Sequence, residues 1–208
     1  MKKLEYREFE GAELRFLEEE SQEKKITGYA AVFNRYAEGL PFREKIAPGA
    51  FAKSIQEGAD VRLLINHDGL PLARTKSKTL RLSEDSKGLF IEAAVDAEDP
   101  DVQRIMPKLK RKDLDQMSFG FYVTKDKWEH SETGPSTRTI MEVDLFDVSI
   151  VTYPAYPQTS VSMRSAQEVY DSFVAQMQTQ AEATKIEQKQ TFDARNRKLE
   201  LEKRRIRL

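Results

Sequence analysis

The sequence predicts an α+β protein, mainly β, that ends in a long helical tail. Between residues 25 and 151, runs of β-branched and aromatic residues alternate with turn formers, which is typical of strands. Only two stretches in this part have the spacing and end signals of a helix. From residue 165 to 208 the chain has no Gly or Pro and is rich in Ala, Gln, Glu, Lys and Arg, which favours a helix.

The first elements are two strands and a short helix. Residues 25–33 (KITGYAAVF) mix β-branched, aromatic and small residues, so we expect a buried strand there. The segment 43–58 has apolar residues four apart, a proline suited to a first turn and a closing glycine, which predicts a short helix. Residues 61–65 (VRLLI) are a compact apolar run that ends in a cluster of turn formers at 66–69. His67 is therefore expected at the exit of a strand.

A hairpin and a second helix follow. Residues 79–82 and 89–95 flank a loop of Ser, Asp and Gly, which is typical of a β-hairpin. Asp99 and Asp101 precede a stretch whose end is basic, so we interpret them as a helix start and not as an acid–base pair or a metal site. Pro107 is expected to kink or shorten that helix.

Two long strands complete the domain. They are expected at 117–128 and 138–151, joined by a polar loop with Gly and Pro. Phe119, Phe121 and Trp128 are interpreted as core or sheet-face residues and not as substrate pockets.

Composition divides the chain into an N-terminal segment (1–24), one domain (25–164) and a charged helical tail (165–208). A chain of 208 residues with 39% hydrophobic content can bury one sizeable core, but not two independent ones. The tail mixes basic and acidic residues, so a solvated helix is its simplest interpretation.

Charge and cysteine content exclude several classes of function. Lys and Arg total 34 against 35 Asp and Glu, so the net charge of −1 gives no general nucleic-acid-binding field. The absence of Cys excludes disulfides, thiolate catalysis and Cys-ligated zinc, and two His leave little for a metal site. We therefore expect no cofactor and no metal. We also expect no membrane contact, because no apolar run reaches the length of a signal peptide or a membrane span.

One set of residues can supply serine chemistry, which needs a nucleophile, a base and a group that orients the base. The candidates are Ser118 at a strand start, His67 after a strand, and Asp147 within an apolar strand. Gly120 would allow a substrate to approach the backbone near the serine. The simpler alternatives are a structural serine and a solvated turn histidine that hydrogen-bonds Asp68.

Six blocks between Gly28 and Arg164 carry a family resemblance. In chain order they are GYAAVFN, EKIAPGAF, LINHDGLPLART, TLRLSEDSKGLFIEAAV, MSFGFYV and DLFDVSIVTYPAY. Together they resemble the prohead maturation proteases of tailed bacteriophages (caudoviruses), which are distantly similar to the herpesvirus assemblins. The resemblance implies a herpesvirus-protease-like β-barrel surrounded by helices.

The resemblance also assigns roles to residues of this sequence. It places the catalytic histidine at His67 and the nucleophile at Ser118. The third member falls on Asp147, the acid just before Val-Ser. Asp144 is the runner-up, since residues 144 and 147 would lie on opposite faces of a regular strand, and Glu142 is the third choice.

Analogy with the assemblins suggests backbone amides near Ala155 and Tyr156 as oxyanion-hole donors, since Pro154 and Pro157 cannot donate. His130 falls in a polar loop, and we do not expect it to be catalytic. Arg74 could bind a substrate carboxylate, but an ordinary ion pair is the preferred interpretation.

The implied function is a serine endopeptidase of procapsid maturation. It would cleave scaffold, or the scaffold-like N-terminal (delta) segment of the major capsid protein, and itself, inside the procapsid in the host cytoplasm. The resemblance allows a homodimer, and no specific nucleic acid is expected as a partner. The alternatives are a catalytically silent capsid-assembly or scaffold protein with the same fold, and a coiled-coil interaction protein, which would explain only the tail.

Overall fold

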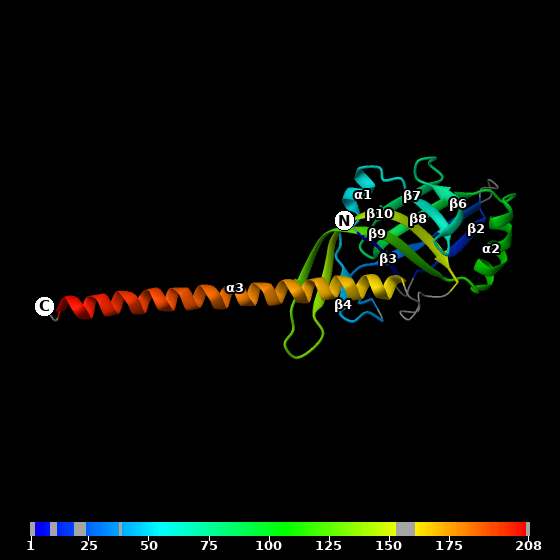
Figure 1. The fold of residues 1–208 in the computed structure, drawn as a ribbon. Coiled ribbons are helices and arrows are strands. Elements are labelled where there is room, and N and C mark those ends of the chain that lie inside the picture. Colours follow the sequence, from blue (N-terminus) through cyan, green and yellow to red (C-terminus); the bar gives the residue numbers. More distant parts are fainter. Residues whose placement is uncertain (1–2, 9–11, 19–23, 38, 153–160, 207–208) are drawn as a thin grey trace. The chain divides into compact units, whose positions relative to one another are not determined.

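The computed structural model describes residues 3–8, 12–18, 24–37, 39–152 and 161–206. The chain divides into two compact units, residues 1–166 and 167–208. Figure 1 shows the strands gathered in the first unit, with two helices at its periphery.

The larger sheet contains six strands and carries the residues predicted to be catalytic. Its strand order is β1-β9-β10-β5-β6, and β4 also pairs with β10. The strands are β1 (Leu4–Glu8), β4 (Arg43–Ile46), β5 (Arg62–Ile65), β6 (Asp68–Arg74), β9 (Gln116–Glu129) and β10 (Thr137–Val151). Strand β10 pairs antiparallel with β9 but parallel with β4 and β5, so it forms the centre of this sheet.

The second sheet is antiparallel and has the order β2-β3-β8-β7. Its strands are β2 (Arg15–Glu18), β3 (Lys24–Val32), β7 (Leu80–Glu84) and β8 (Gly88–Val95). Apolar side chains of both sheets join one buried cluster, which includes Ile26 and Ile91 from this sheet and Phe119 and Phe121 from the larger one. The alternating pattern of β8 explains its place, since every second residue faces this core.

Two short helices lie in the first unit. Helix α1 (Ala52–Gln56) is shorter than the predicted stretch. Helix α2 (Pro100–Arg111) begins at Asp99, whose side chain accepts a hydrogen bond from the Asp101 amide at 2.8 Å. This confirms the interpretation of the acidic pair as a helix start. Pro107 lies inside α2, and the helix continues beyond it to Arg111.

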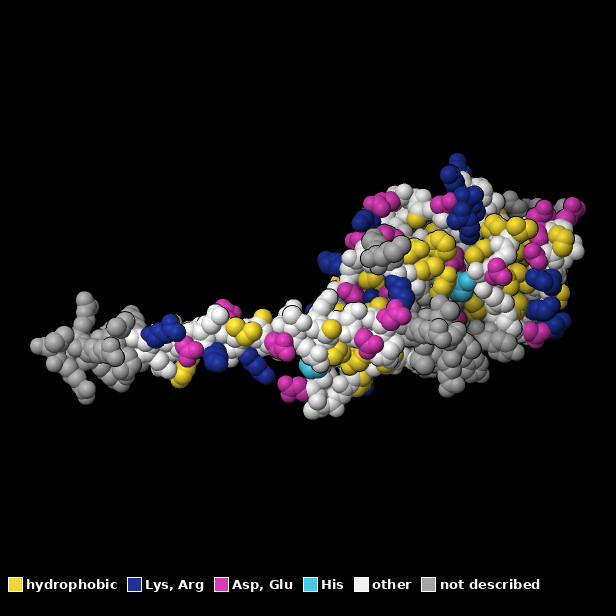
Figure 2. Space-filling view, in the orientation of Figure 1, with side chains coloured by type: hydrophobic (Ala, Val, Ile, Leu, Met, Phe, Trp, Pro, Cys, Tyr) yellow, Lys and Arg dark blue, Asp and Glu magenta, His cyan; other side chains and the backbone are white. Residues whose placement is uncertain are grey.

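Helix α3 (Val161–Ile206) has 46 residues. Its residues from 178 to 197 are exposed, and Figure 2 shows basic and acidic side chains interspersed along it. This pattern agrees with a solvated helix. Among the described residues, no helix combines the length and the apolar character needed to cross a lipid bilayer.

The structure confirms the mainly β, α+β class with a C-terminal helix, but the described strands do not close into one barrel. They form two sheets, with edges at β1 and β6 in the larger sheet. Strands β1, β2, β4 and β6 were not expected from the sequence. The segments LEYRE and REKI show why: they bury charged residues instead of presenting an apolar run. Strands β1 and β2 lie within segment 1–24, and both pair with strands of the following domain.

Candidate active site

Ser118 is the third residue of β9, and its side chain is buried. Its Oγ lies 2.6 Å from Nε2 of His67 and 3.2 Å from the carbonyl oxygen of Arg7 in the neighbouring strand β1. The hydroxyl has one hydrogen, which it can donate to either acceptor. The contact with the imidazole is the shorter one, and it is the contact that a general base needs.

His67 is held by a tight turn between β5 and β6. Ile65 pairs with Asp68, so Asn66 and His67 form a two-residue hairpin loop. Their φ angles are 53° and 59°, and the type I′ turns that suit such loops need a positive φ at both positions. Asn tolerates this conformation well, and its side chain also accepts from the Thr152 amide at 2.9 Å. The prediction that His67 lies at a strand exit is confirmed.

Asp147 orients the imidazole from the other side. Its Oδ1 lies 2.5 Å from Nδ1 of His67, and the Asp147 side chain is only 2% exposed. A carboxylate at Nδ1 favours the tautomer with its proton there, which leaves Nε2 to accept from Ser118. The three residues therefore lie in the order that acyl transfer requires, nucleophile, base and orienting acid.

The two alternative acids do not take this position. Glu142 forms an ion pair with Lys53 at 3.0 Å and accepts from Thr124 at 2.9 Å. The expectation that residues 144 and 147 lie on opposite faces of β10 was wrong. A register shift between Leu145 and Asp147 lets Asp144 pair with Tyr122 while Asp147 pairs with Gly120. Since residues 120 and 122 share a face, the bulge places both acids on one face, and Asp147 is the one that reaches His67.

Gly120 makes room for this acid. A Cβ at residue 120 would lie 2.5 Å from Oδ2 of Asp147 and 2.8 Å from a ring carbon of Tyr6. We expected this glycine to admit a substrate. The structure gives it a different task, because the missing side chain lets the carboxylate and the ring lie over the strand.

Two contacts of the site were not foreseen. Ser149 is fully buried, donates to Oδ1 of Asp147 at 2.9 Å and accepts from the His67 amide at 3.2 Å. Tyr6 lies with its ring centroid 4.3 Å from that of His67. The DLFDVSIVTYPAY block could have drawn attention to Ser149. This serine follows Asp147 by two residues and so shares its face of the strand. Nothing local in the sequence indicates that β1 reaches the site.

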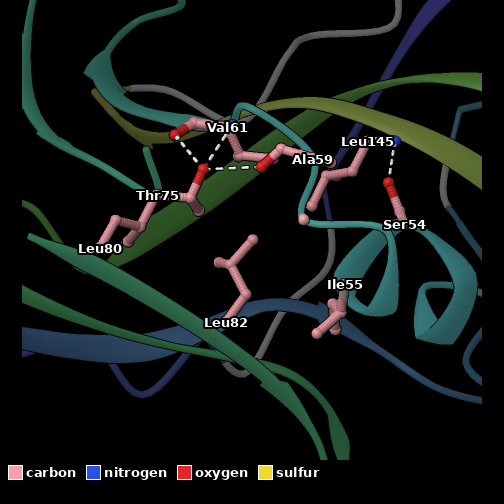
Figure 3. A pocket seen from close by; sticks show the side chains of 9 residues that line it. Ser54, Ile55, Ala59, Val61, Thr75, Leu80, Leu82 and Leu145 are labelled. Carbon is pink, nitrogen blue, oxygen red and sulfur yellow. Dashed lines mark hydrogen bonds between the residues drawn. The ribbon is translucent and has the colours of Figure 1, made fainter. Parts of the chain in front are cut away.

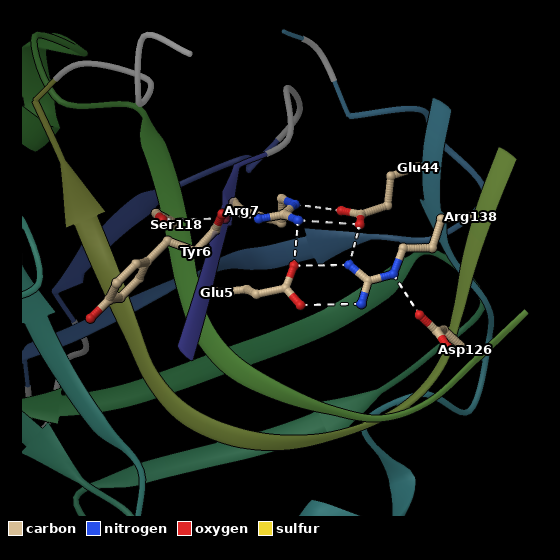
Figure 4. Close-up of polar contacts among 7 residues, drawn as sticks. All are labelled: Glu5, Tyr6, Arg7, Glu44, Ser118, Asp126 and Arg138. Atoms are coloured by element: carbon tan, nitrogen blue, oxygen red, sulfur yellow. Dashed lines mark hydrogen bonds and ion pairs between the residues drawn. The ribbon is translucent and has the colours of Figure 1, made fainter. Parts of the chain in front are cut away.

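A buried network of charges lies on the other side of β1 (Figure 4). Arg7 pairs with Glu5 at 2.6 Å and also with Glu44, and Arg138 pairs with both glutamates at 2.9 Å. Asp126 accepts from Arg138 at 2.7 Å. The positive charges of the two arginines equal the negative charges of the two glutamates. Such pairing is the condition under which charges can be buried.

The network shifts the titration of its members. Burial by itself would raise the pKa of Glu5, but the positive charges of Arg7 and Arg138 outweigh it and lower the pKa below its usual value. Burial would lower the pKa of Arg138, and the negative charges of Glu5 and Glu44 raise it instead. The folded state therefore favours the charged forms of Glu5, Arg7 and Arg138.

The remaining candidates lie away from the set of Ser118, His67 and Asp147, which we call the triad. His130 is exposed, with Nδ1 3.3 Å from Oγ of Ser136. Arg74 forms the expected ion pair, with Asp60 at 2.5 Å. The expected oxyanion donors, Ala155 and Tyr156, lie outside the described residues. No group of three or more His, Asp and Glu placed to hold a metal ion occurs in the described part of the chain.

A cavity of about 170 Å³ lies beside α1 (Figure 3). Its lining is mostly apolar, with Ile55, Leu80, Leu82 and Leu145 among its residues, and no member of the triad lines it. Leu145 belongs to the buried core cluster. The cavity is therefore not lined by the candidate site residues.

Three comparisons relate this chain to known proteins. The family model described as the caudovirus prohead serine protease matches residues 11–172. The prohead protease of Enterobacteria phage HK97 is 29% identical over 139 residues, which cover 65% of this chain and 57% of that relative's length. The solved structure of the bacteriophage T4 capsid assembly protease aligns with a TM-score of 0.49 at 11% identity, over 72% of this chain and 97% of that one. The match to the family model extends over most of the chain and includes all three residues of the triad, so this chain belongs to the caudovirus prohead serine proteases.

Proposed function

We propose that the chain is a serine endopeptidase of phage procapsid maturation, with Ser118, His67 and Asp147 as its catalytic triad. The observation that carries the proposal is the imidazole of His67, which bridges the two other side chains at 2.6 and 2.5 Å. Isolated structural serines and turn histidines have no reason to meet in this order across a sheet. Membership of the family supports the same reaction.

The reaction follows from the geometry. Nε2 of His67 takes the hydroxyl proton while Oγ of Ser118 attacks the carbonyl carbon of the peptide bond. Asp147 holds the Nδ1 proton and stabilises the imidazolium that forms. His67 then gives its proton to the leaving amine, and water hydrolyses the acyl-enzyme by the same route. We predict that the backbone amides of Ala155 and Tyr156 form the oxyanion hole. In another protease, removing one donor from the oxyanion hole lowers turnover about a hundredfold.

The substrates proposed are capsid proteins. The relative from phage HK97 is named a prohead protease, which supports proteolysis within the prohead. We propose that the chain cleaves scaffold or the delta segment of the major capsid protein, and itself. We place the enzyme inside the procapsid, in the host cytoplasm. We also propose the division into segment 1–24, domain 25–164 and tail 165–208, a herpesvirus-protease-like arrangement of the core and a homodimer as the working form.

The test is co-expression with the cognate major capsid protein, with peptide masses read by mass spectrometry. We expect cleavage by the wild type, and none by Ser118→Ala or His67→Ala. The exposed His130 and the buried Ser54 offer matched controls, and His130→Ala and Ser54→Ala should both cleave. Cleavage by Ser118→Ala would refute the triad. No cleavage by the wild type in assembled shells would favour the silent assembly protein.

A further inference from the structure

Tyr6 is an aromatic residue of β1 that the proposed mechanism does not use. It pairs with Gly120 across β1 and β9, so both residues face the side of the sheet that carries the triad. Figure 4 shows its ring turned away from the charged side chains of Glu5 and Arg7. The ring packs against the imidazole of His67, with a centroid distance of 4.3 Å and an angle of 57° between the planes.

The same ring lies beside the acid of the triad. Oδ2 of Asp147 is buried and has no hydrogen-bond partner among the described residues. A Cβ at Gly120 would approach both this oxygen and ring carbons Cδ1 and Cε1 of Tyr6, so the carboxylate and the ring share the space above the glycine. Burial, followed by the negative charge of Asp147, raises the pKa of Tyr6 above its usual value, as expected of a phenol close to a carboxylate.

The flanking residue fixes the ring in place. Arg7 anchors β1 in the core through its buried pairs with Glu5 and Glu44. Its carbonyl oxygen lies 3.2 Å from Oγ of Ser118, so β1 contacts the nucleophile as well. A strand held by such pairs cannot shift without exposing or separating buried charges, which is costly. Tyr6 is therefore a rigid wall of the site and not a mobile surface residue.

We propose that Tyr6 is a positioning residue, whose ring holds the His67 imidazole against Asp147 and keeps water from the Asp147 carboxylate. This inference rests on the proposed function, because it concerns how the triad is aligned. The contacts are made by ring carbons, so phenylalanine should replace tyrosine. A misaligned base is costly, since a displacement of about 1 Å can reduce a rate about a hundredfold.

The test measures activation of Ser118 without a peptide substrate. The full chain is treated with a fluorophosphonate probe, whose phosphorus forms a bond to Oγ as fluoride leaves and the proton passes to His67. We expect Tyr6→Phe and the control Tyr36→Ala, at an exposed tyrosine, to react at the wild-type rate. Tyr6→Ala should react at about one tenth of the wild-type rate or more slowly. With a peptide substrate, its kcat should fall while its KM stays unchanged.

Three kinetic results would overturn the inference: wild-type labelling of Tyr6→Ala, labelling of Tyr6→Phe as slow as that of Tyr6→Ala, or a change confined to KM, which would make Tyr6 a substrate contact. Circular dichroism checks folding, and Tyr6→Leu serves as the ringless variant if Tyr6→Ala does not fold. Proton NMR of the His67 Nδ1 hydrogen, assigned with His67→Ala, provides a readout independent of catalysis. The signal should persist in Tyr6→Phe and be lost to exchange in the ringless variant. Failure of the wild type to react with the probe refutes the proposed function, and an unchanged NMR signal in the ringless variant refutes the role of Tyr6.

Discussion

Gly120 lies directly opposite Asp147 in the β9–β10 pair, and the Asp147 carboxylate fills the space that a side chain at residue 120 would need. The relationship explains why the MSFGF segment combines a nucleophile with a glycine two residues later. Both positions face the same side of β9, where the first supplies the hydroxyl and the second supplies the room.

The first prediction concerns this space. In Gly120→Ala the new Cβ would displace Oδ2 of Asp147 and the ring of Tyr6, so we expect proteolysis to fall about a hundredfold. Gly134→Ala is the matched control, since its nearest neighbour would be Oγ of Ser131 at 3.6 Å, an ordinary contact. Cleavage of a capsid-protein peptide and thermal denaturation measure the effects. Equal activity of the two variants would contradict the assigned role of Gly120.

The second prediction concerns Ser149. Removing its hydroxyl takes one of two hydrogen bonds from Oδ1 of Asp147 and removes the acceptor of the His67 amide, so Ser149→Ala should lower kcat about tenfold or more through misalignment. Ser54→Ala removes a buried hydroxyl that accepts from the Leu145 amide away from the triad. Both variants should lose about 1–3 kcal/mol of stability, because each leaves buried groups unpaired. Only Ser149→Ala should lose activity, and parallel losses in both variants would make Ser149 merely structural.

The third prediction concerns the buried charges. Arg138→Met leaves Glu5 and Glu44 with too little positive charge, and breaking a buried pair in this way costs about 3–5 kcal/mol. Lys127→Met removes an exposed pair with Glu129, which is worth about 1 kcal/mol or less. Urea unfolding followed by fluorescence gives both values. Similar small losses would mean that the network is not a major source of stability.

The fourth prediction concerns acid. The folded-state pKa of Glu5 lies below its usual value of 4.5, so ionised Glu5 stabilises the fold above that pH. This stabilisation is lost as the pH falls from 4.5 through the folded-state pKa. We expect the free energy of unfolding to decline over this range, and less steeply in Glu5→Gln than in the wild type. The exposed Glu129 serves as the control, and Glu129→Gln should keep nearly the full slope.

The sequence alone determined the long patterned elements and the chemical candidates. Strands β3, β8, β9 and β10 carry apolar runs, and the pattern of such a run is visible among neighbouring residues. These strands could therefore be predicted from the sequence. The turn formers around His67 predicted its place at the exit of a strand. Six ordered blocks indicated the family, and the family indicated which serine, histidine and acid to examine.

Tertiary structure decided how these residues meet. Glu5 and Arg138 lie 133 positions apart, and neither can be recognised as buried until both strands are paired. The bulge before Asp147 placed two acids on one face, and β1 brought Tyr6 and the carbonyl of Arg7 to the triad. The division into two sheets also depended on pairings between distant strands. Local propensity acts over a few residues, whereas burial of charge and alignment of a triad depend on contacts that exist only after the strands have assembled.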